Sequence, residues 1–335
     1  MFFDFPQTPA ENEWLKERLE TLSAKESIIL SAAIQRNPPE NVVDAINLLA
    51  SLQDYDIRFP VSSYEDLGKH YLVEADLHLS ELALAHTDMD ALGRAFEDSH
   101  PGLLIGDYYV MYPGNARITV YNGTNLAAFK DEDWSVKVRI ASAANPDGVW
   151  VRLPDYEDLG GGPRDEISIA VRELGVKSID GCSILDARCI LPEAGNLMEQ
   201  YSDAAELVYD GNNLGYALDE RAQGMRGFEQ KLAAVMEYEN CQTLQDVIRC
   251  ADEIRQYSFV TKDKLEEYAT SELKKAGAPE ALIVGGVFDL EGFAKESLTQ
   301  SGYQLDCSGS VYIKPRQPEQ EQQEECHPSQ YHCML

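Results

Sequence analysis

Residues 135–153, SVKVRIASAANPDGVWVRL, contain two short runs rich in valine and isoleucine, separated by turn-forming residues. Apolar and polar residues alternate in the first run, and β-branched residues dominate the second, which is typical of strands. The letters ANPDG between the runs combine asparagine, proline and glycine, which favour turns. We therefore predict two strands, 135–141 and 148–153, joined by a turn.

The segments on either side complete a small unit. ARITVY at 116–121 predicts a third strand, and CSILDARCIL at 182–191 is a further strand candidate. In GGGPRDEISIAVRELG, residues 160–175, a proline and an aspartate open a helix and Gly175 ends it. Residues 115–191 thus indicate a sheet with a helix on it, which places the protein in the α+β class.

Helical periodicity prevails outside this unit. Apolar spacing predicts one helix over 11–35 and another over 40–53, with a double proline between them. Ser62 or Ser63 is expected to cap the next helix. Helix returns over 196–256.

A helical module occurs twice in the chain. With an offset of 201 residues, apolar positions match apolar positions and acids match acids. The matched pairs are Ala32 with Ala233, Tyr64 with Leu265, Leu67 with Tyr268, Leu72 with Leu273, Asp88 with Asp289, Asp90 with Glu291 and Val110 with Val311. One residue of slippage also pairs Tyr55 with Tyr257. Two copies at this distance indicate duplication of a domain.

These patterns predict an elongated, multi-domain α+β protein, in which a small sheet-plus-helix unit separates two related, mostly helical modules. The expected domains are a first module at 1–113, the α+β domain at 114–190, an acidic helical domain at 191–240, a second module at 241–314 and a disordered, Gln/Glu-rich tail at 315–335. Residues 191–313 together repeat 2–112.

The charge of the chain is strongly negative, with 58 acidic residues against 28 basic ones and a net charge of −30. This sign disfavours binding to nucleic acid and to anionic membranes. No apolar run is long enough to span a membrane, and seven scattered cysteines suit a reducing compartment, so a cytoplasmic location is expected. Solubility, adaptation to salt or a solvated surface would each explain the charge; imitation of a polyanion is the further alternative.

One segment concentrates the acids. From Cys189 to Glu220 there is no lysine or arginine. The segment contains Glu193, Glu199, Asp203, Glu206, Asp210, Asp219 and Glu220. Four of them, at 199, 203, 206 and 210, have helical spacing and are expected to form one row, about 5.4 Å apart, opposite an apolar stripe. Such a row would imitate the phosphates of DNA; an ordinary acidic solvent face is the alternative reading.

A second segment without lysine or arginine runs from His70 to Gly93. Its acids are Glu74, Asp76, Glu81, Asp88 and Asp90, and their repeat counterparts Asp289 and Glu291 complete the predicted acidic surface. His78 and His86 lie in this segment but are not part of a metal-binding motif. CHPSQYHC at 326–333 has four residues that could bind zinc, but the tail has too few apolar residues to fold around the ion. We therefore predict no metal, no cofactor and no catalytic site.

The order, pattern and charge of several segments resemble the ArdA-type antirestriction proteins carried by conjugative elements. The segments are ARITVYNGTNLAAF at 116–129, DEISIAVRELG at 165–175, NLMEQYSDAAELVYDGNNLGYALDE at 196–220, VFDLEGFAKESLTQSGYQL at 287–305 and GSVYI at 309–313. The resemblance covers about 115–313 and implies an elongated, acidic α+β protein shaped like bent B-form DNA. Members of this family occupy the DNA-binding groove of type I restriction–modification enzymes and are often homodimers.

Two features depart from the family. An additional module, 2–112, precedes the segment that carries the resemblance, and Lys16 and Arg18 interrupt the acids of its first helix. The expected function is still antirestriction by mimicry of B-form DNA, with a type I restriction–modification enzyme as partner and no enzymatic activity. An acidic adaptor of a mobile element that binds another basic DNA-handling protein is the alternative. A metal-dependent enzyme that uses some of the carboxylates and histidines is a third reading.

Overall fold

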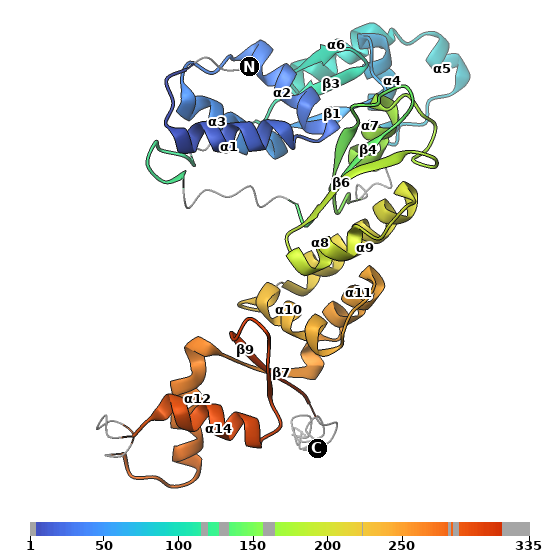
Figure 1. The fold of residues 1–335 in the computed structure, drawn as a ribbon. Coiled ribbons are helices and arrows are strands. Elements are labelled where there is room, and N and C mark those ends of the chain that lie inside the picture. Colours follow the sequence, from blue (N-terminus) through green and yellow to red (C-terminus); the bar gives the residue numbers. More distant parts are fainter. Residues whose placement is uncertain are drawn as a thin grey trace, which may run out of the picture. The chain divides into compact units, whose positions relative to one another are not determined.

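The computed structural model describes residues 5–114, 120–126, 134–156, 165–222, 224–280, 283 and 288–316 (Figure 1). They divide into two compact units. Unit 1 falls within residues 1–187 together with Ser202–Ala205, and unit 2 falls within residues 188–201 and 206–335. Helices and three small sheets make up the described part of the chain, so the protein belongs to the α+β class, as predicted. None of the described helices combines the length and the apolar character that crossing a lipid bilayer requires.

Unit 1 begins with three helices, α1 (Pro9–Glu20), α2 (Ala24–Arg36) and α3 (Val42–Ala50). The prediction of a single helix over 11–35 was wrong, because the chain breaks after Glu20. Ser23 starts a new helix there: its hydroxyl accepts from the Glu26 N–H, and the Glu26 carboxylate accepts from the Ser23 N–H. This capping box satisfies two backbone donors at the helix start, which a continuous helix would not need.

The predicted helix over 40–53 ends early. After Ala50 the chain tightens into a 3₁₀ turn, η1 (Leu52–Asp54), which leads into the short strand β1 (Asp56–Arg58).

The first sheet has the strand order β1-β3-β2, with β2 (Gly102–Ile105) and β3 (Tyr108–Met111) forming an antiparallel hairpin. Three helices connect β1 to β2: α4 (Tyr64–Glu74), α5 (Glu81–Ala85) and α6 (Met89–Ser99). Ser63 caps α4, which confirms one of the two predicted caps. Leu67, Phe96 and Tyr109 meet in the core between these helices and the sheet.

Helices α4 and α6 pack backbone against backbone. A Cβ atom on Gly93 would lie 1.9 Å from the carbonyl oxygen of Tyr64, and one on Gly68 would lie 2.2 Å from that of Met89. Only glycine fits at these two positions without moving a helix.

The central sheet has the order β5-β4-β6, formed by β4 (Val136–Ala141), β5 (Val149–Leu153) and β6 (Ser183–Cys189). The predicted pair of strands is confirmed as an antiparallel hairpin. Helix α7 (Asp165–Glu173) packs against β5, and Gly175 follows it with φ 64°, as expected for a helix end.

The predicted strand at 116–121 falls largely outside the described residues. Its last two residues, Val120 and Tyr121, are described and are not in a strand. Their N–H groups both donate to the Asn47 side-chain oxygen at 2.8 Å, and the Asn47 amide donates back to the Tyr121 carbonyl. The Asn47 side chain, from α3, therefore makes the backbone hydrogen bonds that a neighbouring strand would make if this segment were in a sheet.

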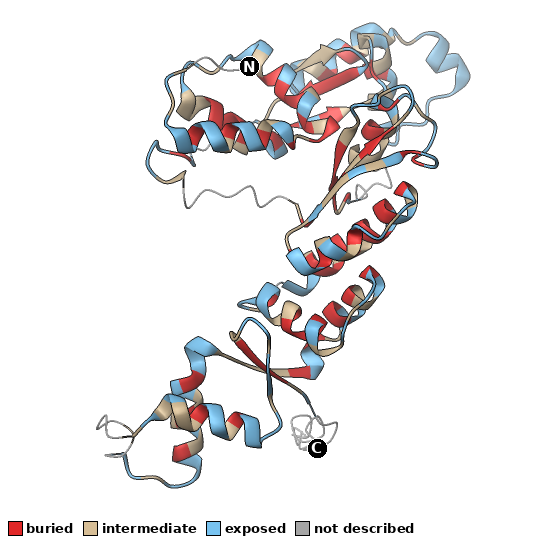
Figure 2. Cartoon of the chain, in the orientation of Figure 1, coloured by how far each residue is buried: buried red, intermediate tan, exposed pale blue. Residues whose placement is uncertain are grey.

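Unit 2 repeats the order of the first sheet of unit 1 and of the helices before and within it, but has no counterpart of the central sheet among its described residues. It contains α8 (Pro192–Met198), most of α9 (Ala204–Ala222), α10 (Phe228–Tyr238), α11 (Leu244–Asp252), η3 (Ile254–Gln256), β7 (Tyr257–Thr261), η4 (Lys262–Lys264), α12 (Leu265–Lys275), α14 (Leu290–Gln300), β8 (Gln304–Leu305) and β9 (Val311–Pro315). Its sheet has the order β7-β9-β8, and the buried faces of its helices and strands are drawn in red in Figure 2.

Three pairs of helices in the two copies agree in length and in offset. Helices α4 and α12 have 11 residues each and an offset of 201, and so do α6 and α14. Helices α3 and α11 have nine residues each and an offset of 202. At the close helix contact, Gly68 and Gly93 are replaced by Ala269 and Ala294, both fully buried.

Two predicted matches need correction. Tyr109 pairs with Arg58 in the first sheet and Tyr312 with Val260 in the second, so the counterpart of Val110 is Ile313 and not Val311. The turn between β8 and β9 is two residues longer than that between β2 and β3, which shifts β9. The buried Ala32 likewise matches the buried Ala234, because helix α10 keeps the offset of 202.

Candidate functional site

The predicted row of four acids on one helix is wrong. Helix α8 ends at Met198, Glu199 is its C-cap, and α9 begins only at Ala204. The N–H groups of Gln200 and Tyr201 bond to carbonyl groups three residues back, which tightens the chain and ends the helix. Of the four acids in the predicted row, Glu199 and Asp203 therefore precede α9, and Glu206 and Asp210 lie on it.

Asp210 is not part of an exposed acidic surface. It is 8% exposed, and its carboxylate accepts from the Tyr201 hydroxyl and from the Gln245 side-chain amide, both at 2.7 Å. Burial, and then the bond to Asp210, raise the pKa of Tyr201, so the phenol remains a donor. Asp210 thus ties α9 to α11 and has a structural role.

The other acids of segment 189–220 differ in exposure. Glu193, Glu199, Asp203, Glu206 and Glu220 are exposed, and Asp219 is half-buried. Within the described part of the chain, Glu193, Glu199 and Glu220 form no ion pair. These three carboxylates are the ones whose charge is available to a partner.

Most acids of the second predicted segment have local roles. Asp88 caps α6, and Asp90 forms an ion pair with Arg94 at 2.8 Å. Glu74 binds the Arg58 guanidinium through both oxygens, at 2.8 and 2.9 Å, and this contact lowers the pKa of Glu74. Their charges are neutralised or used in capping, which weakens their part in an acidic surface.

The counterparts in unit 2 behave in the same way. Asp289 caps α14, and Glu291 forms an ion pair with Lys295 at 2.7 Å. The acids that correspond between the two copies therefore have roles in folding. In each module an aspartate caps one helix, and an acid two residues later forms an ion pair with a base one turn further along that helix.

Two acids remain exposed near α5. Glu81 lies in the first turn of α5. Asp76 lies two residues after the end of α4 and is in the left-handed region, with φ 52°, where the second copy has Gly277 with φ 74°. Asp76 also approaches the His78 ring at 3.5 Å.

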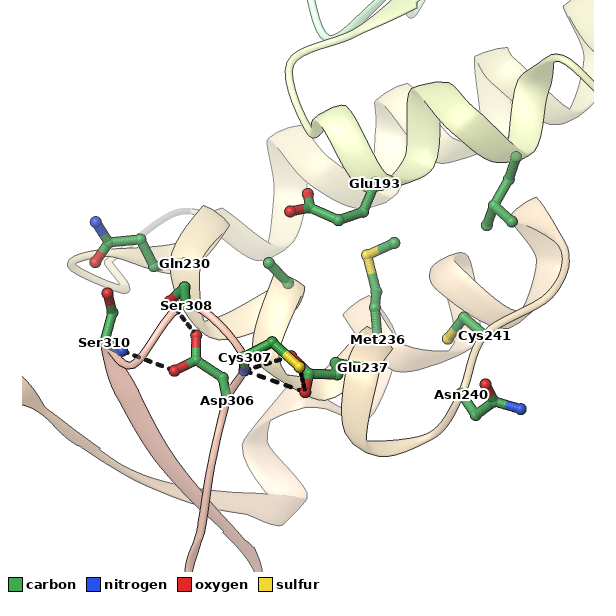
Figure 3. A pocket seen from close by; sticks show the side chains of 12 residues that line it. Glu193, Gln230, Met236, Glu237, Asn240, Cys241, Asp306, Cys307, Ser308 and Ser310 are labelled. Carbon is green, nitrogen blue, oxygen red and sulfur yellow. Dashed lines mark hydrogen bonds between the residues drawn. The ribbon is translucent and has the colours of Figure 1, made fainter. Parts of the chain in front are cut away.

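An open pocket of about 650 Å³ lies in unit 2 between α8, α10 and the turn before β9 (Figure 3). Three carboxylates line it, from Glu193, Glu237 and Asp306. The Cys307 N–H donates to Glu237 at 2.9 Å, and the N–H groups of Ser310 and Val311 donate to Asp306 at 2.8 Å. These contacts hold the turn in place.

The lining of this pocket suits a cationic side chain, because it carries three acids, whereas lysine and arginine are absent from its lining residues. The sequence analysis included Glu193 but missed Glu237 and Asp306. No local spacing could have found them, since folding alone brings residues so distant in sequence to one pocket. Among the described residues, no group of three or more potential metal ligands is close enough to hold an ion, and the CHPSQYHC segment lies outside that part.

A buried ionic cluster joins α2, α7 and β5 in unit 1. Burial alone would raise the pKa of Glu26, but the guanidinium groups of Arg18 and Arg152 hold it below its usual value. Glu166 lies beside them and accepts from the Ser23 hydroxyl at 3.1 Å. Burial, and then the Glu26 charge, raise the pKa of Glu166 to about 8. Glu166 is therefore mostly protonated at neutral pH.

No protein-family model, curated protein or solved structure matches this chain.

Proposed function

We propose that this protein is an antirestriction protein of the ArdA type, which blocks the DNA-binding groove of a type I restriction–modification enzyme. It would act by binding alone, with carboxylates in the places of DNA phosphates, and would make or break no covalent bond.

The observation that carries this proposal is the segment 189–220, which has seven acids and no base, with five of the acids exposed. An ordinary helical surface mixes both signs, because like charges one turn apart destabilise a helix. Three of these exposed acids, Glu193, Glu199 and Glu220, form no ion pair among the described residues, and such available negative charge favours a basic partner.

The structure changes how these charges are presented. They come from both ends of α8, the segment before α9 and the length of α9, instead of from one continuous row. Glu193 also lines the acidic pocket of Figure 3, which adds a recess suited to a lysine or arginine side chain of the partner.

The test is inhibition of DNA cleavage by a purified type I enzyme, at about 0.05 and about 0.2 M NaCl. We expect the inhibition constant to rise steeply with salt, because ion pairs and counterion release dominate such binding. Inhibition that is indifferent to salt, or absent, would refute the proposal.

A matched pair of variants separates a specific surface from net charge. The triple change Glu193→Gln, Glu199→Gln and Glu220→Gln is expected to weaken inhibition about tenfold, or about 1.4 kcal/mol. The control removes the same charge from exposed positions of α1, through Glu13→Gln, Glu17→Gln and Glu20→Gln, and should change inhibition less than threefold. Equal effects of both triples would mean that only net charge matters.

The alternative, an acidic adaptor for another basic DNA-handling protein, predicts a different outcome. The type I enzyme would then be unaffected, while a basic DNA-binding protein would bind the chain and lose binding with the first triple only.

A further inference from the structure

Exposed apolar side chains gather on one part of unit 1, around α5. Half of the large apolar side chains that are exposed in the described part of the chain fall within residues 73–84. They are Val73, Leu77, Leu79, Leu82 and Leu84, and we call them the α4–α5 patch. Val73 is 80% and Leu82 72% exposed, and α5 has no buried residue (pale blue in Figure 2). All of them except Leu82 line one hollow, and exposed apolar surface that is gathered in this way marks an interaction site.

The patch borders a groove. A hollow of about 380 Å³ lies between the end of α4 and α5; four leucines, Val73 and Met89 form its apolar walls, and Lys69, Asp76 and His78 also line it. Leu72 contributes to the wall from the buried side of α4, whereas Leu77 and Leu84 reach it from the connecting segment and from α5. The groove gives apolar side chains of a partner a place to enter.

Acids surround the patch. Segment 70–93 has no lysine or arginine, and Asp76 and Glu81 are exposed beside the leucines. Three cations adjoin the segment, and each pairs with at least one carboxylate: Arg94 pairs with Asp90 at 2.8 Å, and Lys69, which also lines the hollow, and Arg58 each pair with two. Lys69 pairs with Glu65 at 2.7 Å and Asp66 at 3.7 Å, and Arg58 pairs with Asp56 at 3.0 Å and Glu74 at 2.8 Å. The rim of the patch is therefore negative.

The second copy carries charged residues at two of the five patch positions. With the offset of 201, Val73 corresponds to Lys274 and Leu79 to Glu280, both exposed. Helix α12 nevertheless has the length of α4, and the same bonds end both helices. The module therefore folds without an apolar residue at the positions of Val73 and Leu79, whereas Leu82 corresponds to the half-buried Ile283.

We propose that the α4–α5 patch binds a basic amphipathic helix of another protein. Leucine-type side chains of that helix would enter the groove, and its lysines or arginines would meet the acidic rim. Charge complementarity selects this partner over a second copy of the chain, whose net charge is −30 and whose own patch has the same negative rim. It also disfavours an anionic lipid surface. This inference goes beyond the proposed function and does not rest on it.

The test uses the full chain and a fluorescein-labelled synthetic helix of about 18 residues, roughly 27 Å long, made of leucine and lysine with all leucines on one face. Fluorescence anisotropy measures its Kd at about 0.15 M and about 0.5 M NaCl. The control peptide has the same composition with the leucines spread around the helix. We expect the amphipathic peptide to bind at least tenfold tighter than the control, and to keep that advantage at the higher salt, where purely electrostatic binding is screened.

Variants locate the binding site. The double change Val73→Ser and Leu82→Ser should weaken binding of the amphipathic peptide at least tenfold. Both side chains are exposed, so folding is expected to be unchanged, and circular dichroism checks this. The matched control, Val120→Ser with Leu185→Ser, removes one valine and one leucine that are about half exposed elsewhere in unit 1, and should bind like the natural sequence.

Three outcomes would overturn the proposal. The two peptides could bind equally, the patch variant could bind like the control variant, or the protein could self-associate in analytical ultracentrifugation and lose this only in the patch variant. The last result would make a second copy the occupant. The Glu193, Glu199 and Glu220 triple variant should bind the peptide normally, so failure of the proposed function and failure of this inference are distinguishable.

Discussion

Replacing Glu166 by glutamine is expected to stabilise unit 1 at alkaline pH and to change it little at acid pH. Glu166 lies beside the buried Glu26 carboxylate, and burial together with that charge raises its pKa to about 8. The natural protein must therefore keep a proton on Glu166 or tolerate two neighbouring negative charges. A glutamine resembles the protonated acid and can still accept from the Ser23 hydroxyl.

The sign follows from linkage. The pKa of Glu166 is higher in the folded chain than its ordinary value of 4.5, so the stability associated with its proton is complete below pH 4.5 and is lost as pH rises through about 8. At about 1.36 kcal/mol per pH unit, the loss between these values has an upper limit of about 5 kcal/mol. The Glu166 residue is only half-buried, so solvent screening reduces this limit, and we expect about 2 kcal/mol as an order of magnitude. Glu166→Gln should recover that amount at pH 9 and almost none at pH 5.

Tryptophan fluorescence can follow this change in unit 1 alone. The chain has three tryptophans, Trp14, Trp134 and Trp150, and all lie in unit 1. Urea unfolding of the full chain, recorded by tryptophan emission between pH 5 and pH 9, therefore reports on the unit that contains Glu166. The Trp150 indole donates to the Glu20 carbonyl at 2.9 Å, so its emission is sensitive to the contact between β5 and α1.

An exposed acid on α1 serves as the control. Glu13→Gln removes the same charge from solvent and should leave the pH dependence of unfolding unchanged. If Glu166→Gln destabilises the protein at pH 9, or has the same effect at pH 5 and pH 9, the argument from burial and the Glu26 charge is incorrect.

Three further changes test the packing of the two modules. Gly93→Ala is expected to cost about 2–3 kcal/mol in unit 1, seen as earlier loss of tryptophan emission, because the new Cβ would lie 1.9 Å from the Tyr64 carbonyl oxygen; an unchanged midpoint would show that the helices can move apart. Hydrogen peroxide should join Cys241 and Cys250, whose Sγ atoms lie 3.4 Å apart, into one disulfide, with both thiol protons leaving in two molecules of water. This disulfide should stabilise unit 2 by about 2–3 kcal/mol, and peptide mapping that finds both thiols reduced would contradict the prediction. Asp289→Ala should cost about 1 kcal/mol through loss of the α14 cap, measured as faster hydrogen exchange in α14, whereas Asp289→Asn should keep the cap.

Local patterns predicted those parts of the fold that depend on neighbouring residues. Alternating valines and the ANPDG letters were enough for the hairpin of β4 and β5, because strand period and turn chemistry are properties of adjacent residues. The same holds for the Ser63 cap of α4 and for the end of α7 at Gly175. The capping box at Ser23 was missed because a strong apolar period ran across it, although its serine and glutamate have the expected spacing.

The candidate site was less predictable from the sequence. Helical spacing placed Asp210 in an exposed row, but Gln245, from another helix, and Tyr201 surround its carboxylate. Spacing also could not distinguish acids that cap helices, such as Asp88, from acids whose charge is available, such as Glu199. These distinctions depend on which polar groups approach from elsewhere in the chain.

By itself, the sequence determined the α+β class, the net charge, the main hairpin and the presence of two matching sets of apolar positions. Only the tertiary structure decided where the predicted acidic helix breaks, which carboxylates are buried or paired, and that β9 is shifted by a longer turn. Composition and hydrophobic periodicity are properties of the linear sequence, so they can be determined without knowledge of the fold. The charge that a partner meets depends on contacts between distant segments, and those exist only after packing.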